Sequence, residues 1–107
     1  MTFEQVTSFE QMLGRLEEHT QVIVLLKSRS CSVCEAVETQ ALEFSAAFPD
    51  VHFAGVQLED VPEIRGQWTV FSAPTILFFY HGKEVWRGSR FISWDELGAA
   101  VERTLGR

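Results

Sequence analysis

The sequence has few cysteines and few basic residues, and each scarcity excludes a class of protein. Two cysteines in 107 residues are too few for the disulfide framework of a small secreted domain. Nine Lys and Arg stand against fifteen Asp and Glu, giving a net charge of −6, and the scattered basic residues form no cluster that would bind nucleic acid or an anionic membrane. No apolar run is long enough to span a membrane. We therefore expect neither a nucleic-acid partner nor a membrane partner.

The composition that is present suits a packed globular protein. Hydrophobic residues make up 46% of the chain and aromatic residues 12%, and the length is close to the commonest domain size. We predict one domain over residues 1–107. The first residues, MTFEQVTSFEQ, have neither the basic start nor the apolar stretch of a secretory signal, so the expected location is cytoplasmic.

Hydrophobic patterns and capping signals predict alternating helices and strands. Ser8, Asp60 and Ser93 are each followed three residues later by Gln or Glu, which is the spacing of a helix capping box. The predicted elements in chain order are an edge strand in 1–6, a helix over 9–18, a strand over 21–27, a helix over 31–48, a strand over 51–58, a helix over 61–67, strands over 74–80 and 83–88 joined by a tight turn, and a helix over 94–105. Helical crossovers predict parallel pairing of the early strands, while the hairpin adds an antiparallel edge. The predicted fold class is α/β, a mixed sheet with helices on both faces.

The two cysteines lie in SRSCSVCE, directly after the apolar run VIVLL. Cys31 is predicted at the N-terminus of a helix, where free N–H groups and the helix dipole favour the thiolate form. Cys34 is predicted one turn later, on the apolar face of the same helix. We therefore expect Cys31 to act as the nucleophile and Cys34 to resolve the mixed disulfide.

Zinc binding, haem attachment and inert packing are the alternatives for this pair. A structural zinc site needs four Cys or His ligands; the chain adds only His19, His52 and His81, none at a finger-like spacing, which leaves a zinc site shared by two chains. Haem attachment requires His directly after the second cysteine, where Glu35 stands, and is excluded. Inert core cysteines also stay open. The redox interpretation is favoured, and we predict no metal and no cofactor.

The buried strand, the Cys-x-x-Cys at the start of a long helix and the later SAPTILFFYHGKEV together resemble the thioredoxin family. The resemblance extends from about residue 3 to 105. In that family a cis-proline opens a strand opposite the cysteine pair, and Pro74 matches it. The resemblance implies a thioredoxin-like fold and substrate contacts from Ser30, Ala73, Pro74, Thr75 and Ser89.

The sequence also departs from the family pattern. Ser30 stands in place of a Trp, and Ser32 and Val33 in place of Gly-Pro. Leu25 and Gly55 replace the buried Asp that relays a proton to the second cysteine and the Lys paired with that Asp. Losing both together leaves no unpaired buried charge. We expect mixed disulfides to be resolved more slowly than in thioredoxin itself.

The predicted function is a thiol–disulfide oxidoreductase. The resemblance implies disulfide-containing protein substrates and a reductant that is either a thioredoxin-reductase-type enzyme or a low-molecular-weight thiol. The alternative is a thioredoxin-fold binding or redox-sensing module with weak or no reductase activity, which the departures from the family pattern keep open.

Overall fold

A computed structural model describes residues 3–106. In chain order the elements are β1 (Glu4–Val6), α1 (Phe9–Glu18), β2 (Gln21–Lys27), α2 (Cys34–Ser45), β3 (His52–Gln57), α3 (Glu63–Gln67), β4 (Thr75–Tyr80), β5 (Lys83–Ser89) and α4 (Trp94–Thr104). The five strands form one sheet in the order β1-β3-β2-β4-β5. β1 and β2 pair with β3 in parallel, whereas β4 pairs antiparallel with both β2 and β5. The predicted mixed sheet is confirmed; residues 1–2 of the predicted edge strand lie outside the described residues.

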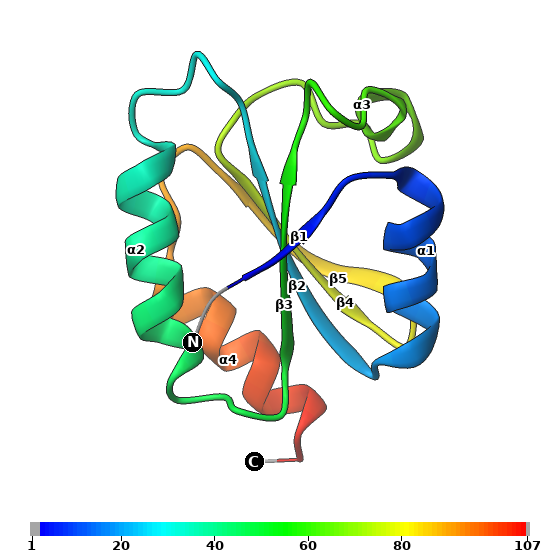
Figure 1. Cartoon of the computed structure of the whole chain (residues 1–107). Coiled ribbons are helices and arrows are strands. Elements are labelled where there is room, and N and C mark those ends of the chain that lie inside the picture. Colours follow the sequence, from blue (N-terminus) through cyan, green and yellow to red (C-terminus); the bar gives the residue numbers. More distant parts are fainter. Residues whose placement is uncertain (1–2, 107) are drawn as a thin grey trace.

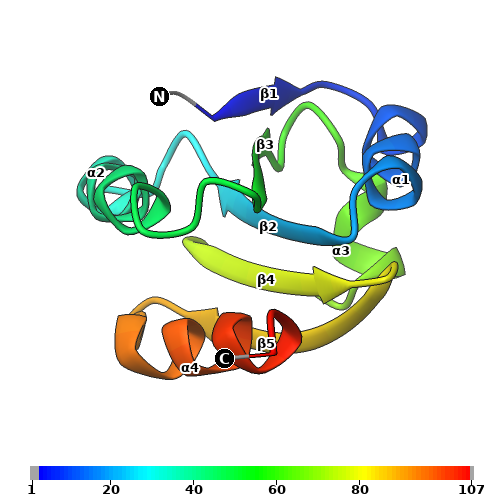
Figure 2. The same ribbon diagram turned by 90° about the horizontal axis from the view of Figure 1, so that it is seen from below.

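Strand β2 lies inside the sheet and is buried on both faces. Alternate side chains of a strand point to opposite faces, so Val22, Val24 and Leu26 enter one apolar cluster while Ile23 and Leu25 enter the other. Figure 1 shows the sheet edge-on, with α1 and α3 on one side and α2 and α4 on the other. The same separation appears from below in Figure 2. A continuous apolar run, without polar residues at alternate positions, is the pattern expected of a strand buried on both faces.

Two of the three predicted capping boxes are confirmed. The hydroxyl of Ser8 accepts a hydrogen bond from the backbone N–H of Gln11 at 3.0 Å, and that of Ser93 accepts from the N–H of Glu96 at 3.3 Å. Each bond satisfies one of the N–H groups that a helix leaves free at its start. These caps set the starts of α1 and α4 where the sequence predicted them.

The third predicted cap is wrong. α3 begins at Glu63, two residues later than predicted, and Pro62 occupies its N-cap position. The carboxylate of Asp60 instead accepts a hydrogen bond from the guanidinium of Arg29 at 3.0 Å. The Asp60 side chain, which the local spacing predicted to cap α3, is thus bound to Arg29, a residue distant in sequence.

Helix α2 also ends three residues earlier than predicted. The helix ends at Ser45, and the amides of Ala46, Ala47 and Phe48 each bond to a carbonyl three residues earlier. Such bonds form a tighter turn that commonly follows a helix. Apart from the starts of β1 and α2, each three residues later than predicted, the remaining bounds agree to within one residue, well inside the usual difference at element ends.

The three tryptophans pack at the edges of the two clusters. Trp68 lies against the cluster on the α1 side, and Trp86 and Trp94 lie against the other. Trp94 also donates a hydrogen bond from its indole N–H to Gln40 at 3.0 Å.

No helix within residues 3–106 is long and apolar enough to cross a membrane.

Leu25 and Gly55 are direct neighbours in the sheet. Leu25 of β2 is in register with Gly55 of β3, and Gly55 with Gln5 of β1. A Cβ atom on Gly55 would lie 3.0 Å from the amide nitrogen of Gln5, so the Gln5 side chain covers the glycine. Leu25 is fully buried among apolar side chains. Where the family resemblance implies a buried Asp there is therefore a hydrocarbon side chain, and where it implies a Lys there is a glycine covered by the Gln5 side chain.

We expect Leu25→Asp to lower the free energy of unfolding by about 3–5 kcal/mol at pH 7, because the carboxylate would be buried without a cation. Burial raises the pKa of such a carboxyl in the folded state, so the loss should shrink as the pH falls from that raised value toward the unfolded value of about 3.9, below which both states are protonated. Urea unfolding at pH 4 and pH 7 measures this. Leu25→Asn, the uncharged control, should lose the same stability at both pH values. Equal unfolding free energies of the Asp and Asn variants at pH 7 would contradict the prediction.

Candidate redox site

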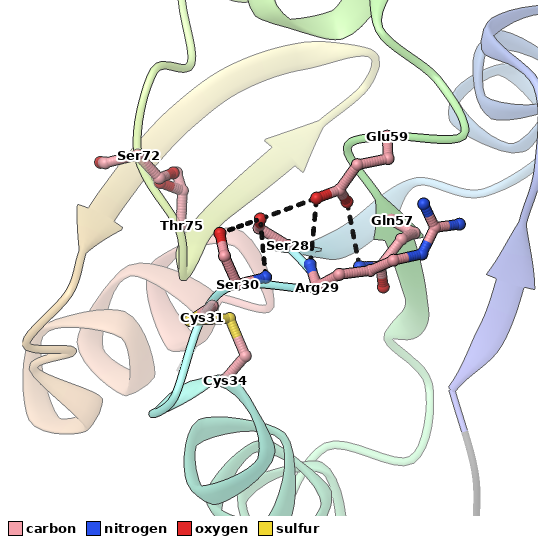
Figure 3. Close-up of a disulfide and its surroundings, with 9 residues drawn as sticks. All are labelled: Ser28, Arg29, Ser30, Cys31, Cys34, Gln57, Glu59, Ser72 and Thr75. Atoms are coloured by element: carbon pink, nitrogen blue, oxygen red, sulfur yellow. Dashed lines mark hydrogen bonds between the residues drawn. A yellow bond between two sulfur atoms is a disulfide. The ribbon is translucent and has the colours of Figure 1, made fainter.

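Cys31 and Cys34 form a disulfide between the end of β2 and the start of α2 (Figure 3). Their Cα atoms are 5.5 Å apart, within the range of about 4.4–6.8 Å that disulfides require. Cys31 is partly exposed and Cys34 is buried. The pair therefore has the difference in exposure that a nucleophile and a resolving cysteine need, and the two roles stay predictions.

The position of the pair relative to the helix differs from the prediction. α2 begins at Cys34, not at Cys31. The amide of Cys31 donates to the carbonyl of Ser28 at 3.1 Å, which closes a turn over residues 28–31 ahead of the helix. The free N–H groups of α2 consequently lie nearest to Cys34. The Cys31 sulfur is held beside the helix start through its bond to the Cys34 sulfur.

A carboxylate from a distant loop holds this turn. Glu59 accepts two hydrogen bonds on one oxygen, from the hydroxyl of Ser28 at 2.9 Å and from the amide of Arg29 at 3.1 Å. Its other oxygen accepts from the side-chain amide of Gln57 at 3.1 Å (Figure 3). The segment that leads into Cys31 is thus tied to the end of β3.

These hydrogen bonds favour the ionised form of Glu59. A hydrogen bond from its own backbone N–H is the largest cause that lowers the pKa of Glu59, followed by those from Ser28, Arg29 and Gln57, and together they bring the pKa to about 2. An ionised carboxylate only accepts hydrogen bonds. The Ser28 hydroxyl must therefore donate to Glu59 and can only accept from Ser30, whose hydroxyl lies 3.1 Å away.

Sequence reasoning missed Glu59 because no local pattern connects it with Ser28. The signal available was topological. Parallel strands end at the same edge of a sheet, and Lys27 at the end of β2 is in register with Gln57 at the end of β3. Residues that follow these two positions, including Ser28 and Glu59, therefore meet.

The proline predicted to oppose the cysteines has the expected peptide geometry: the Ala73–Pro74 bond is cis. Thr75, next along the chain, is buried, and its hydroxyl donates to the carbonyl of Ser72 at 2.7 Å. Ser89 lies opposite it on β5, with the two hydroxyl oxygens 3.2 Å apart. The Thr75 and Ser89 side chains thus bond to each other, and the predicted substrate contacts of both residues stay predictions.

An open groove of about 750 Å³ borders the disulfide. Three of the predicted site residues line it: Ser30, Cys31 and Ala73. The groove is also lined by the exposed apolar side chains of Val33 and Phe91, which are 50% and 95% accessible. Sequence reasoning did not identify these two residues as part of the site. Among the described residues that line the groove, Arg90 carries the charge. We call this space the apolar groove.

The described residues 3–106 contain no group of three or more His, Cys, Asp or Glu side chains placed to hold a metal ion. His19 and His52 instead stack on each other with ring centroids 4.1 Å apart. His52 also lies 2.7 Å from the Glu4 carboxylate. Two of the three histidines that the chain could offer to a zinc site are therefore stacked on each other.

Residues 1–102 match the family model described as Thioredoxin. A thioredoxin-like protein of Fusarium culmorum is 31% identical over 108 residues, covering 94% of this chain and 89% of that protein. Thioredoxin-like protein YdfQ of Bacillus subtilis is 28% identical over 88 residues, or 82% and 79% of the two chains. Thioredoxin-2 of Pyricularia oryzae is 31% identical over 85 residues, but these span 79% of this chain and only 50% of that relative.

Solved structures show the same fold. Plasmodium falciparum thioredoxin superposes with a TM-score of 0.81 at 21% identity, covering 94% of this chain and 97% of that one. A designed protein gives a TM-score of 0.85 at 16% identity, with 98% and 99% covered. The family and the cysteine pair support a role like that of a thiol–disulfide oxidoreductase. On the match over residues 1–102, the chain belongs to the thioredoxin family.

Proposed function

We propose that the protein is an oxidoreductase that reduces or exchanges disulfides of protein substrates through Cys31 and Cys34. The observation that carries this proposal is the disulfide between a partly exposed and a buried cysteine, with the exposed one opening onto the apolar groove. A cytoplasmic location stays a prediction.

The reaction is a thiol–disulfide exchange between the protein and its substrate. The Cys31 thiolate attacks one sulfur of the substrate disulfide, forming a mixed disulfide and releasing the other substrate sulfur, which takes up a proton. Cys34 then loses its proton and attacks the Cys31 sulfur, which closes the Cys31–Cys34 disulfide and releases the second substrate thiol. Two electrons have passed to the substrate. A thioredoxin-reductase-type enzyme or a low-molecular-weight thiol returns them.

The apolar groove supports binding of an extended peptide around the substrate cysteine. Ala73 lines the groove together with Cys31, and the family resemblance implies that its backbone pairs with such a peptide. Ser30 presents an acceptor oxygen there, because its hydroxyl hydrogen is used on Ser28. Val33 and Phe91 offer exposed apolar surface, so a hydrophobic residue near the substrate cysteine would gain buried area.

A binding module without reductase activity is the second candidate. The observation that favours it is the exposed apolar surface of Val33 and Phe91, since contacts made there do not require the sulfurs. Exposed apolar patches commonly mark sites of protein contact. Partner binding that persists in the double variant Cys31→Ser/Cys34→Ser, together with an inactive parent protein, would select this candidate.

For the oxidoreductase, we expect Cys31→Ser to abolish reduction of insulin disulfides by the protein with dithiothreitol as electron donor, because no thiolate remains to attack. Cys34→Ser should instead accumulate a covalent mixed disulfide with the substrate, visible by mass spectrometry of the intact adduct. Ser32→Ala, between the two cysteines, is the matched control and should retain turnover. Full activity of Cys31→Ser would refute the assignment of roles.

The low pKa of Glu59 predicts a transition in acid. Because the folded pKa of about 2 lies below the reference value of 4.5, the hydrogen bonds to this carboxylate are fully present above pH 4.5 and are lost as the pH falls toward 2. The amide chemical shift of Arg29, followed by NMR, should titrate with a midpoint near 2.

The transition should disappear in Glu59→Gln and persist in Glu63→Gln, a control that removes a nearby carboxylate in the first turn of α3. A midpoint near 4.5 in the parent protein would show that Glu59 does not hold the turn before Cys31.

A further inference from the structure

A second groove, of about 760 Å³, meets both sulfurs. It shares Cys31 with the apolar groove, but Cys34 also borders it. Its lining is charged, with side chains from the end of β2, the turn before Cys31, α2 and the loop after β3: Lys27, Arg29, Glu35, Glu38 and Asp60. We call it the charged groove. The resolving cysteine, although buried, therefore borders a polar space.

Lys27 and Glu38 form an ion pair in this groove. The ammonium nitrogen of Lys27 lies 3.1 Å from a carboxylate oxygen of Glu38, and the two side chains are only 16% and 28% exposed. Partial burial weakens the screening by water that makes most surface pairs negligible. The carboxylate is thus held in a defined place on the wall of the groove.

The position of Glu38 on α2 directs it toward Cys34. Glu38 follows Cys34 by four residues in the same helix, and residues with this spacing lie on one face, about 5–6 Å apart at their Cβ atoms. Side chains of a helix also lean toward its N-terminus. Glu38 and Cys34 therefore share one face of α2, and both border the charged groove.

The other acidic side chains of the groove are less suited to meet this sulfur. Asp60 pairs with the guanidinium of Arg29 at 3.0 Å, and it lies in the turn after β3, not on the helix that carries Cys34. Glu35 directly follows Cys34, and adjacent positions on a helix do not face each other. Leu25, which occupies the family's buried Asp position, is hydrocarbon and cannot take a proton. Glu38 is left as the carboxylate that shares both the groove and the helix face of Cys34.

We propose that Glu38, held by Lys27, accepts the proton of Cys34 during resolution of the mixed disulfide. This inference rests on the proposed oxidoreductase function. The S–H proton of Cys34 passes across the groove to the Glu38 carboxylate, and the sulfur electron pair forms the bond to the Cys31 sulfur. The bond between Cys31 and the substrate sulfur breaks, and the departing thiolate takes a proton from Glu38 or from solvent. Electrons balance within these three sulfurs.

Single-turnover kinetics on the full chain test this assignment. Reduced protein is mixed with an excess of insulin, the reaction is stopped with acid, and the mixed disulfide and the closed Cys31–Cys34 disulfide are quantified by mass spectrometry. Glu38→Gln should form the mixed disulfide at the parent rate but resolve it at least about tenfold more slowly, since a positioned base typically contributes that much or more.

Two further readouts separate proton transfer from a structural role. Glu38→Asp should recover part of the resolution rate, because it retains a carboxylate on the same face. Acetate added to Glu38→Gln should accelerate resolution without affecting the first step, since the groove is open to small carboxylates. A variant that had only disturbed the fold would respond to neither.

Matched controls decide between a specific base and a general charge effect. Glu43→Gln makes the same substitution on the exposed side of α2 and should resolve at the parent rate. Glu35→Gln removes the same charge from the same groove; slowing equal to that of Glu38→Gln would overturn the proposal. So would unchanged resolution in Glu38→Gln while turnover still depends on Cys31. Absence of any Cys31-dependent reduction in the parent would instead refute the proposed function itself.

Discussion

Burial of β2 on both faces is the constraint on which the rest of the structure depends. Five consecutive apolar side chains, VIVLL, enter two clusters on opposite sides of the sheet, and an ionised group along this strand would have to be desolvated. Polar chemistry is therefore confined to the point where the strand ends. The first polar residues after this run, Lys27 and Ser28, each take part in the network beside the cysteines.

Most of the fold could be predicted because its signals are local. The apolar run of β2 and the Ser8 and Ser93 caps depend on residues within one element or one helical turn. The failures have the opposite character. Asp60 does not cap α3 as predicted but binds the guanidinium of Arg29. This contact joins two segments that only the folded sheet brings together. The spacing of residues along the chain cannot show that a helix end and a distant guanidinium compete for the same carboxylate.

The candidate site divides in the same way. The cysteine pair and Pro74 were found from motifs, and the family resemblance supplied their context. The start of α2 was placed three residues too early, because apolar spacing does not reveal the turn closed by Cys31 and Ser28. Glu59 and the Lys27–Glu38 pair could not be found at all from local pattern. Glu59 joins the loop after β3 to the turn after β2, and Lys27 at the end of β2 pairs with Glu38 on α2. Which residues meet in these contacts depends on how the strands and helices are arranged in the fold.

Cys31 borders both grooves, whereas Cys34 borders only the charged one. On the proposed mechanism, this difference accounts for an apolar Leu25. Attack on a substrate requires surface that fits a peptide, which Val33 and Phe91 provide around Cys31. Resolution requires a place for a proton, which the charged groove provides next to Cys34. A base inside the sheet would have to be desolvated together with a counter-ion. A base on the groove wall avoids that cost, because Lys27 and Glu38 both keep contact with water. On the proposed assignment, a proton acceptor at the surface lets the interior of β2, from Val22 to Leu26, be wholly apolar.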